Sequence, residues 1–396
     1  MTLFSLELPV AAWVLLAVAL VAAVTAWRIG FAPMRRLSIG APRIPDEEET
    51  RLPSLSVIAL MNSDVNVDAF LQAMRRQKYP DFEVILVHEG SARQNEVLEE
   101  RFIDPADNAS PHVRFCFYPP GSHSLSRKKL AITIGAKAAT GEWLFTTSAR
   151  CDVPSDVWLS TIASHFSRHT DVVLGRSQLC FDDLSPRGRA SRRFNFLMAE
   201  AAWMDAALRG LPFRGDGLNL AYRRSLFFGN KGFAATADLV NGEDDIFINA
   251  VATPENTAVE FSDQATPTPH YGEETDRLFD NRRDRRCFTS RFLPRRTFVL
   301  AGFSSVCQWL ALLCGIAGAL LALPSLAGTI AAVALFTAVW LLEAFDYRHG
   351  ARLLGDARGW KIAPAMLLGR PIGNRLFAIR RRKHIHANYS SDTLEP

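Results

Sequence analysis

The chain is poor in cysteine, with six among 396 residues, and no two of them have the spacing of a zinc site or a disulfide pair. Small disulfide-stabilised and zinc-binding domains contain dense, regularly spaced cysteines. The sequence therefore argues against both classes. We expect the six thiols to be reduced packing residues, and they are Cys116, Cys151, Cys180, Cys287, Cys307 and Cys314.

An excess of charge of one sign is also missing. Lys and Arg number 45 against 41 Asp and Glu, a formal net charge of +4. A mixed and nearly balanced charge does not indicate a nucleic-acid-binding protein. At 48% hydrophobic residues, with 26 Phe and 8 Trp, the chain is also too apolar to be disordered.

Charge is absent altogether from two stretches of the chain. Residues 8–27 carry none, and neither do the 46 residues 297–342, which a Leu-Pro-Ser turn interrupts at 323–325. About 20 apolar residues in a helix are needed to cross a bilayer. We therefore predict three transmembrane helices, over 8–27, 298–323 and 326–345. A cleaved signal peptide is the less favoured alternative for the first, because Glu7 stands where basic residues would be expected.

Basic residues flank these segments on one side only. The positive-inside bias then predicts an N-terminus outside, with residues 28–296 and the C-terminus in the cytoplasm. Residues 28–53 are predicted to be a linker. Residues 346–396 are predicted to be a basic tail lying on the inner membrane face, or alternatively a solvated one. The flanking basic residues are Arg28, Arg35, Arg36, Arg291, Arg295, Arg296, Arg348, Arg352 and the run Arg380-Arg381-Arg382-Lys383.

Between the spans, short apolar runs alternate with helical patterns. Strands are predicted at 56–60, 82–87, 113–117 and 143–147, and helices at 67–77 and 127–139. Continuous apolar strands separated by helices indicate an α/β fold with a parallel sheet covered on both faces. Ligands bind such sheets at the C-terminal ends of the strands.

Several segments occur in an order that resembles a membrane-anchored bacterial family 2 glycosyltransferase. These segments are SVIALMNSDVN, QKYPDFEVILVHEGS, RKKLAITIGAKAATGEWLFTTSARCDVPSDVWL, GDGLNLAYRRSLFF, NGEDDIFINAVA and DNRRDRRCFTSRF. The resemblance covers about 240 residues, 54–296. It implies a GT-A fold, a Rossmann-like domain that binds a nucleotide-sugar, in the bacterial inner membrane.

The resemblance also implies which residues bind the donor. The family positions that hold the nucleoside match Asn62, Asp64 and Glu89, and His88 replaces a second acid. His88 could equally be a strand-end histidine hydrogen-bonded to its loop. Lys128 and Lys129 precede a helix near the expected phosphate site, although a solvated helix face would explain two lysines as well.

The carboxylates of the family's metal motif are missing. The motif should read Asp-any-Asp and bind Mn²⁺ or Mg²⁺ across the diphosphate, but the chain has Ser148-Ala149-Arg150. Three interpretations remain open. Arg150 could replace the ion by pairing with the diphosphate, Asp152 could bind a displaced metal, or the metal site could be lost. A divalent metal is therefore a doubtful cofactor.

The acidic residues of the acceptor side are present. In GEDDIF, the pair Glu243-Asp244 matches the family's general base, for which we choose Asp244, and Asp245 adds a third carboxylate. Repulsion among the three could keep one of them basic. The structural alternative is a helix N-terminus stabilised by acids. Asn219 and Tyr222 match positions that line the acceptor pocket, and Leu218 replaces an arginine.

The last family motif, Gln-any-any-Arg-aromatic, is only partly kept. Arg286 retains its arginine, whereas Arg283 replaces the glutamine and Cys287 the aromatic residue. The arginines between Arg277 and Arg291 could contact a donor diphosphate or the inner leaflet of the membrane.

Taken together, the residues and the resemblance predict an inverting inner-membrane glycosyltransferase. It would move a sugar from a nucleotide-sugar donor to a lipid-linked or polysaccharide acceptor. The alternative is a non-catalytic relative that acts as the partner or scaffold of an active transferase. A transporter has little support, because we expect the three spans to hold no intramembrane charge that would mark a pathway.

Overall fold

The computed structural model describes residues 9–38, 52–61, 67–103, 111–120, 126–186, 188–269, 274–323 and 325–381. The chain divides into two compact units, which we describe separately. The helical unit contains the described residues of 9–38, 190–205 and 294–381. The α/β unit contains those of 52–189 and 206–293. Residues 190–205, which fall within the predicted domain over 54–296, belong to the helical unit.

The α/β unit is built on a seven-stranded sheet of order β3-β2-β1-β4-β7-β6-β8. Its first four strands are the predicted ones, and they pair in parallel: β1 (Leu55–Met61), β2 (Phe82–Glu89), β3 (His112–Tyr118) and β4 (Trp143–Ser148). Strands β1 and β4 are buried along their whole length. Continuous apolar runs such as SVIAL form strands here because helices cover both faces of the sheet.

The second half of the sheet departs from the predicted parallel pattern. Strand β7 (Leu220–Arg223) runs antiparallel to β4 and to β6 (Val172–Leu174), and β6 pairs in parallel with β8 (Thr257–Val259). A separate antiparallel pair joins β5 (Cys151–Asp152) to β9 (Thr268–Pro269). The result is a mixed α/β sheet in which most strands are parallel.

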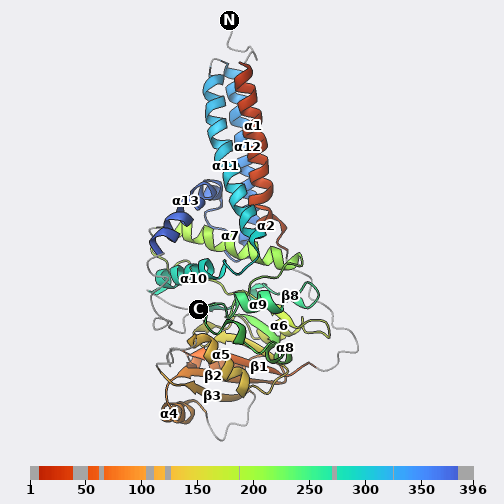
Figure 1. Cartoon of the computed structure of the whole chain (residues 1–396), viewed down its shortest axis with the longest axis vertical. Helices are drawn as coiled ribbons and strands as arrows, with labels where there is room; N and C mark the ends of the chain where they lie inside the picture. The colour runs from red at the N-terminus through yellow and green to blue at the C-terminus, as the bar shows by residue number, and fades with distance from the viewer. Residues whose placement is uncertain are drawn as a thin grey trace. The chain divides into compact units, whose positions relative to one another are not determined.

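Helices surround this sheet (Figure 1). The predicted helices over 67–77 and 127–139 are α3 (Val67–Arg75) and α5 (Arg127–Ala138). Helix α4 (Ala92–Phe102) begins at Ser91, whose side chain forms a capping box with Gln94. The remaining helical elements are α6 (Trp158–Ala163), α8 (Arg224–Gly229), η1 (Ala234–Thr236), α9 (Asp245–Val251), η2 (Asp263–Ala265) and α10 (Thr275–Thr289).

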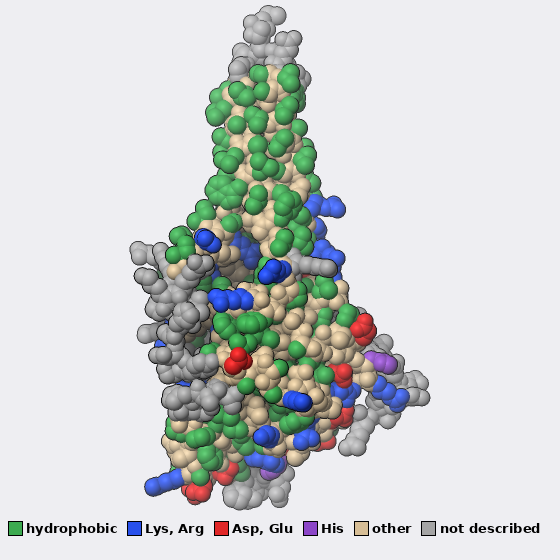
Figure 2. All heavy atoms as spheres, viewed as in Figure 1, with side chains coloured by type: hydrophobic (Ala, Val, Ile, Leu, Met, Phe, Trp, Pro, Cys, Tyr) green, Lys and Arg blue, Asp and Glu red, His purple; other side chains and the backbone are tan. Residues whose placement is uncertain are grey.

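The helical unit contains three helices that are long and apolar enough to cross a membrane. They are α1 (Val10–Gly30), α11 (Arg295–Ala322) and α12 (Leu326–Leu353), with apolar spans over Val10–Gly30, Phe298–Ala322 and Gly328–Leu353. Figure 1 shows them side by side, and α11 packs closely along α1. In Figure 2, hydrophobic side chains cover this face of the three helices. The number and order of the predicted spans are confirmed.

The third helix is longer than predicted and carries a charge-bearing side chain. Helix α12 continues to Leu353, past the predicted end at residue 345. Within it, Glu343 is 4% exposed and accepts a hydrogen bond from Gln308 of α11 at 3.2 Å. The expectation that the spans contain no ionisable residue is therefore wrong. Glu343 lies within the predicted span over 326–345, one residue past the uncharged run that ends at Leu342.

Shorter elements complete the helical unit. They are α2 (Ala32–Arg36), most of α7 (Arg189–Leu208), η4 (Trp360–Ile362) and α13 (Ala363–Arg381). Arg36 of α2 pairs with Asp205 of α7, with Nε 2.9 Å from Oδ1. Helix α7 is held to the chain beyond α12 in the same way, because Arg193 Nε lies 3.1 Å from Asp356 Oδ2.

Candidate active site

Three consecutive acids lead into helix α9. Gly242 precedes them with a φ of +109°, and a Cβ atom there would meet Ile246 at 2.5 Å, so only glycine fits this turn. Asp244 caps the helix, because its Oδ1 accepts a hydrogen bond from the backbone N–H of Asp245 at 2.9 Å. The structural alternative considered for GEDD, an acidic helix N-terminus, is therefore present in the fold.

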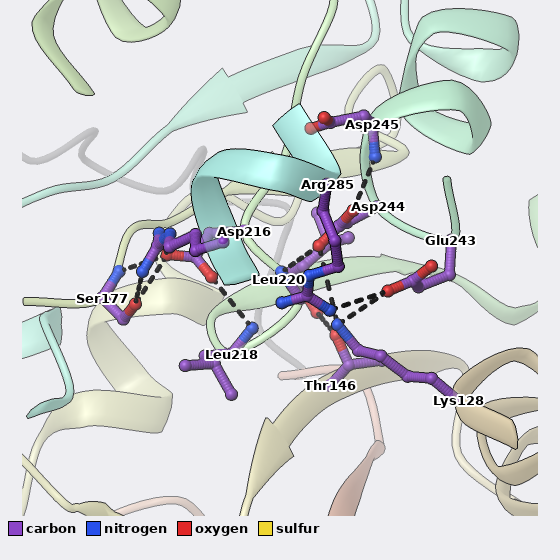
Figure 3. Close-up of polar contacts among 12 residues, drawn as sticks. Lys128, Thr146, Ser177, Asp216, Leu218, Leu220, Glu243, Asp244, Asp245 and Arg285 are labelled. Atoms are coloured by element: carbon purple, nitrogen blue, oxygen red, sulfur yellow. Dashed lines mark hydrogen bonds and ion pairs between the residues drawn. The ribbon is translucent and has the colours of Figure 1, made fainter. Parts of the chain in front are cut away.

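Glu243 is buried and held between two cations. Its Oε1 lies 2.9 Å from Lys128 Nζ of α5 and 3.6 Å from Arg285 Nη1 of α10. Burial by itself would raise the pKa of Glu243, but Lys128 and Arg285 outweigh it and lower that pKa to about 2. Glu243 is therefore ionised, and Figure 3 shows Lys128 and Arg285 pointing toward it.

Asp245 points away from Lys128 and makes different contacts. Its Oδ1 lies 3.0 Å from Arg214 Nε, and its Oδ2 accepts a 2.6 Å hydrogen bond from Thr289 Oγ1. Burial is the largest influence on this carboxyl. Together with the neighbouring Asp244 it raises the pKa of Asp245, although Arg214 opposes the change.

Asp244 is the most accessible carboxylate of the three. Its side chain is 22% exposed, against 2% for Glu243 and 7% for Asp245. Its Oδ2 lies 3.7 Å from Lys128 Nζ and accepts a 3.3 Å hydrogen bond from the N–H of Gly217. A Cβ atom at Gly217 would lie 3.0 Å from the Lys128 amine, so the glycine lets the backbone come this close.

A fourth acid, Asp216, lies beside this group. Its Oδ2 accepts hydrogen bonds from Ser177 N at 2.8 Å and Ser177 Oγ at 2.7 Å, and from Arg282 Nη2 at 2.7 Å. Burial opposes ionisation, yet Arg282 and Ser177 hold the pKa of Asp216 well below its usual range. The effect is to fix α10 to the loop before β7.

These groups line a small polar pocket of about 30 Å³. That volume is sufficient for little more than one water molecule. Acids and cations alternate around it, and the cations come mainly from α10. The lining residues are Lys128, Gly215, Asp216, Asn241, Gly242, Glu243, Asp244, Asp245, Arg282, Arg285, Arg286 and Thr289. The pocket thus contains the predicted residues Lys128, Glu243, Asp244, Asp245 and Arg286.

Other predicted residues are engaged elsewhere. Lys129 is 1% exposed and donates to the carbonyls of Thr236 and Leu239 at 2.5 and 2.8 Å. Glu89 lies at the end of β2, where its Oε2 is 3.2 Å from Arg127 Nη1. Lys129 therefore stabilises a loop in this conformation, and its donor contact stays a prediction. Asn62 and Asp64 lie outside the described residues.

The two predicted acceptor residues are buried in the α/β unit. Asn219 donates through Nδ2 to the carbonyls of Arg176 and Ala265 at 2.8 and 2.6 Å, and its Oδ1 accepts from Trp158 at 3.2 Å. Tyr222 is 1% exposed and stacks on Phe227. Neither lines the polar pocket, so their contact with an acceptor also stays a prediction.

The residues at the end of β4 do not fit a divalent metal. Ser148 Oγ donates to the carbonyl of Leu60 at 3.2 Å, and the next positions are an alanine and an arginine. Hard divalent cations need several oxygen ligands, usually carboxylates. In the described part of the chain, no group of three or more His, Cys, Asp or Glu side chains is arranged to hold a metal. Asp152 lies in β5, with an exposed side chain.

Comparison with known proteins identifies the α/β unit. Residues 56–228 match the family described as glycosyl transferase family 2. This part of the chain is thus similar to a family 2 glycosyltransferase domain. No curated protein sequence matches the chain.

A solved structure supports a GT-A fold for this chain. The mannosyltransferase PcManGT from Pyrobaculum calidifontis, in complex with GDP-Man and Mn²⁺, has 17% identity and a TM-score of 0.51. It covers 92% of this chain and 98% of its own. Residues 1–349 of TarS from S. aureus, in complex with UDP-GlcNAc, have 15% identity and a TM-score of 0.38, covering 85% and 93%.

Several site residues were missed from the sequence. Asp216, Ser177, Arg214 and Thr289 all contact the acidic group or its neighbours. Arg282, one of the arginines predicted as possible diphosphate contacts, pairs with Asp216. Asp216 stands in the quoted segment GDGLNLAYRR, where two glycines around an acid signal a close backbone approach. Ser177 and Thr289 carry no comparable signal, because their role depends on contacts between distant segments.

Proposed function

We propose that this family 2 glycosyltransferase is a membrane-anchored, inverting enzyme with Asp244 as its general base. It would transfer a sugar from a nucleotide-sugar to a lipid-linked or polysaccharide acceptor. One observation carries the proposal: of three adjacent carboxylates, Glu243 and Asp245 are buried beside cations, whereas Asp244 remains 22% exposed at the pocket. A general base must reach the proton that it removes.

The chemistry requires one displacement at the anomeric carbon. The acceptor oxygen forms the new bond, its proton passes to Asp244, and the bond to the nucleoside diphosphate breaks with its electron pair. Lys128 is closer to Glu243, at 2.9 Å, than to Asp244, at 3.7 Å. Glu243 is therefore the main partner of the lysine, and the Asp244 carboxylate remains accessible from the pocket.

We further propose that arginines, rather than a metal, hold the donor diphosphate. Arg282, Arg285 and Arg286 of α10 line the pocket, and a guanidinium binds phosphate oxygens through two parallel hydrogen bonds. Arg150 at the end of β4 is a fourth candidate. The absence of a carboxylate at Ser148 and Arg150 supports this assignment over a displaced metal at Asp152.

The membrane location of the reaction is part of the same proposal. Three apolar helices support anchoring. The basic flanks favour an inner bacterial membrane with the α/β unit in the cytoplasm, where nucleotide-sugars are made.

Substitution of the proposed base is the direct test. Asp244→Asn keeps the shape of the side chain but cannot accept the proton, so turnover should fall about 10²- to 10⁴-fold. Nucleotide-sugar affinity should stay within a few-fold. The matched control is Glu255→Gln, an exposed acid outside the pocket, which should leave turnover unchanged. Full turnover by Asp244→Asn would remove the assignment.

A non-catalytic partner is the second candidate, and the missing metal carboxylates favour it. A thermal-shift screen of the full chain against nucleotide-sugars, with Mn²⁺ or with EDTA, distinguishes an active transferase from a non-catalytic partner. We expect one donor to raise the melting temperature by a few degrees in both conditions, since 100 Kd of ligand adds about 2.7 kcal/mol. A shift that requires Mn²⁺ would contradict the arginine assignment. No shift with any donor would favour the non-catalytic partner.

A further inference from the structure

The helical unit contains a groove that the transferase reaction does not use. It has a volume of about 360 Å³ and lies among α1, α11 and α12. Its walls are almost entirely apolar, with Ala311, Ile316 and Ala319 on α11 and Ala332 and Val333 on α12. This volume lies in the range of about 300–1,000 Å³ that small-molecule sites occupy.

One end of the groove is polar. Gln308 and Glu343 line it there, and they are 8% and 4% exposed. Gln308 Nε2 donates to Glu343 Oε2 at 3.2 Å and to the carbonyl of Pro364 at 3.1 Å. Because both neighbours are acceptors, the amide orientation is fixed. Its oxygen, Oε1, then has no hydrogen-bond donor among the described residues.

Aromatic and basic residues surround the polar end. The indole of Trp309 donates to the carbonyl of Leu368 at 3.0 Å, and that of Trp340 to the carbonyl of Lys361 at 3.1 Å. Arg348 lies 5.1 Å from the Trp360 ring. Tryptophans with basic side chains are typical of the membrane–water interface. The polar end of the groove therefore belongs at headgroup depth, and the apolar part extends into the hydrocarbon.

The groove has the length and lining of an acyl-chain site. Eleven residue steps separate Gln308 from Ala319, so it runs about 16 Å along α11 at about 1.5 Å per residue. Its volume of about 360 Å³ is spread over that length. An extended hydrocarbon chain fits inside such a groove, whereas a helix about 10 Å across would have to lie over its opening.

We propose that this groove binds one chain of a membrane lipid whose head donates hydrogen bonds, through an ammonium or a hydroxyl group. The chain lies between α11 and α12, with Phe336 pressed against Gly315 as part of the wall: a Cβ at Gly315 would meet that ring at 2.5 Å. The head meets Gln308 Oε1 and the Glu343 carboxyl group. Gln308 Oε1 is a buried acceptor without a donor among the described residues, so a choline head, which has no donor to offer, is disfavoured.

Photo-crosslinking of the full chain in lipid nanodiscs tests the proposal. Three probes carry the same diazirine-bearing chain on an ethanolamine, a free-hydroxyl diacylglycerol or a choline head. We expect labelling to concentrate on peptides containing 311–319 and 332–339. The ethanolamine or the hydroxyl probe should exceed the choline probe at least five-fold. Labelling spread evenly over the three helices, or equal for all heads, would overturn the proposal.

Two alanines of α12 provide matched variants. Ala332 is 4% exposed and lines the groove, whereas its neighbour Ala331 is exposed. Ala332→Leu should fill the groove and lower labelling at least five-fold, and Ala331→Leu should not. Ala319→Leu repeats the test from α11 if Ala332→Leu lowers the melting temperature. Equal labelling in filled and control variants would refute the site.

Glu343→Gln separates the two kinds of head. It makes the side chain permanently uncharged and keeps an acceptor oxygen. If the head is an ammonium, the preference for the ethanolamine probe over the hydroxyl probe should disappear. If the head is a hydroxyl group, labelling by the diacylglycerol probe should persist.

Discussion

At the scale of single residues, the site is organised by how each acid is compensated. Glu243 has Lys128 and Arg285, Asp245 has Arg214 and Thr289, and Asp216 has Arg282 and Ser177. A buried carboxylate without such partners would be strongly destabilising. The pairs therefore serve the fold, and they leave Asp244 as the most accessible of the three adjacent acids, as the proposed base requires.

The pKa of Glu243 leads to a prediction about pH. Its folded value of about 2 lies below its ordinary value of 4.5. The ion pair should therefore stabilise the fold fully above pH 4.5, and this contribution should be lost as the pH falls toward 2. The melting temperature of the wild type should exceed that of Glu243→Gln by a few degrees from pH 5 to 8. This difference in melting temperature should narrow below pH 4.5. Melting curves over pH 3–8 measure it.

Glu255→Gln is the control for that series. Glu255 is exposed and lies outside the pocket, so Glu255→Gln should have the same melting temperature as the wild type at every pH. A gap for Glu243→Gln that stayed constant down to pH 3 would mean that the stability does not come from the ionised carboxylate.

The residue roles were only partly predictable. GEDD was recognisable because three adjacent acids before a helix form one local pattern. The partner of Glu243 was not, because Lys128 lies on another element and Lys129 has the same chemistry one position later. Only the path of the chain decides that Lys128 reaches Glu243 while Lys129 turns to Thr236 and Leu239. Long-range contacts of this kind leave no mark in local sequence.

At the scale of elements, helix α5 determines where Lys128 lies. Gly135 brings α5 close to the sheet, because a Cβ atom there would meet Ile58 Cγ2 of β1 at 2.5 Å. The continuous apolar runs predicted β1 to β4, but β7 runs antiparallel because its direction depends on connections that the runs do not encode. The end of α12 was not predictable from the apolar run either, because packing against its neighbours determines it rather than the last apolar residue.

Gly135→Ala should therefore destabilise the enzyme despite the better helix propensity of alanine. Relief of the clash requires α5 to move, and overpacking costs about 1–3 kcal/mol, more than the propensity gain of about 0.5–1 kcal/mol. Gly229→Ala is the matched control in α8, where a Cβ meets nothing within 4 Å. Thermal melting should show a loss for the first and no loss for the second. An equal or higher melting temperature for Gly135→Ala would contradict the close approach.

At the scale of the whole molecule, the predicted topology is testable with reporters. The basic flanks predict a cytoplasmic C-terminus. Green fluorescent protein joined after Pro396 should fluoresce, and alkaline phosphatase at the same position should be inactive. The control is alkaline phosphatase joined before Met1 behind its own export signal, which should be active. An active phosphatase after Pro396 would reverse the orientation.

The close packing of α1 along α11 has a consequence for biosynthesis. Helix α1 ends at Gly30 and α11 begins at Arg295, so almost the entire transferase domain is translated between them. At a translation rate of about 5–20 residues per second, on the order of tens of seconds pass between the synthesis of α1 and that of α11. The membrane bundle is thus completed last. Ribosome stalling or premature termination before residue 295 would leave a folded transferase domain on a single, unpartnered helix.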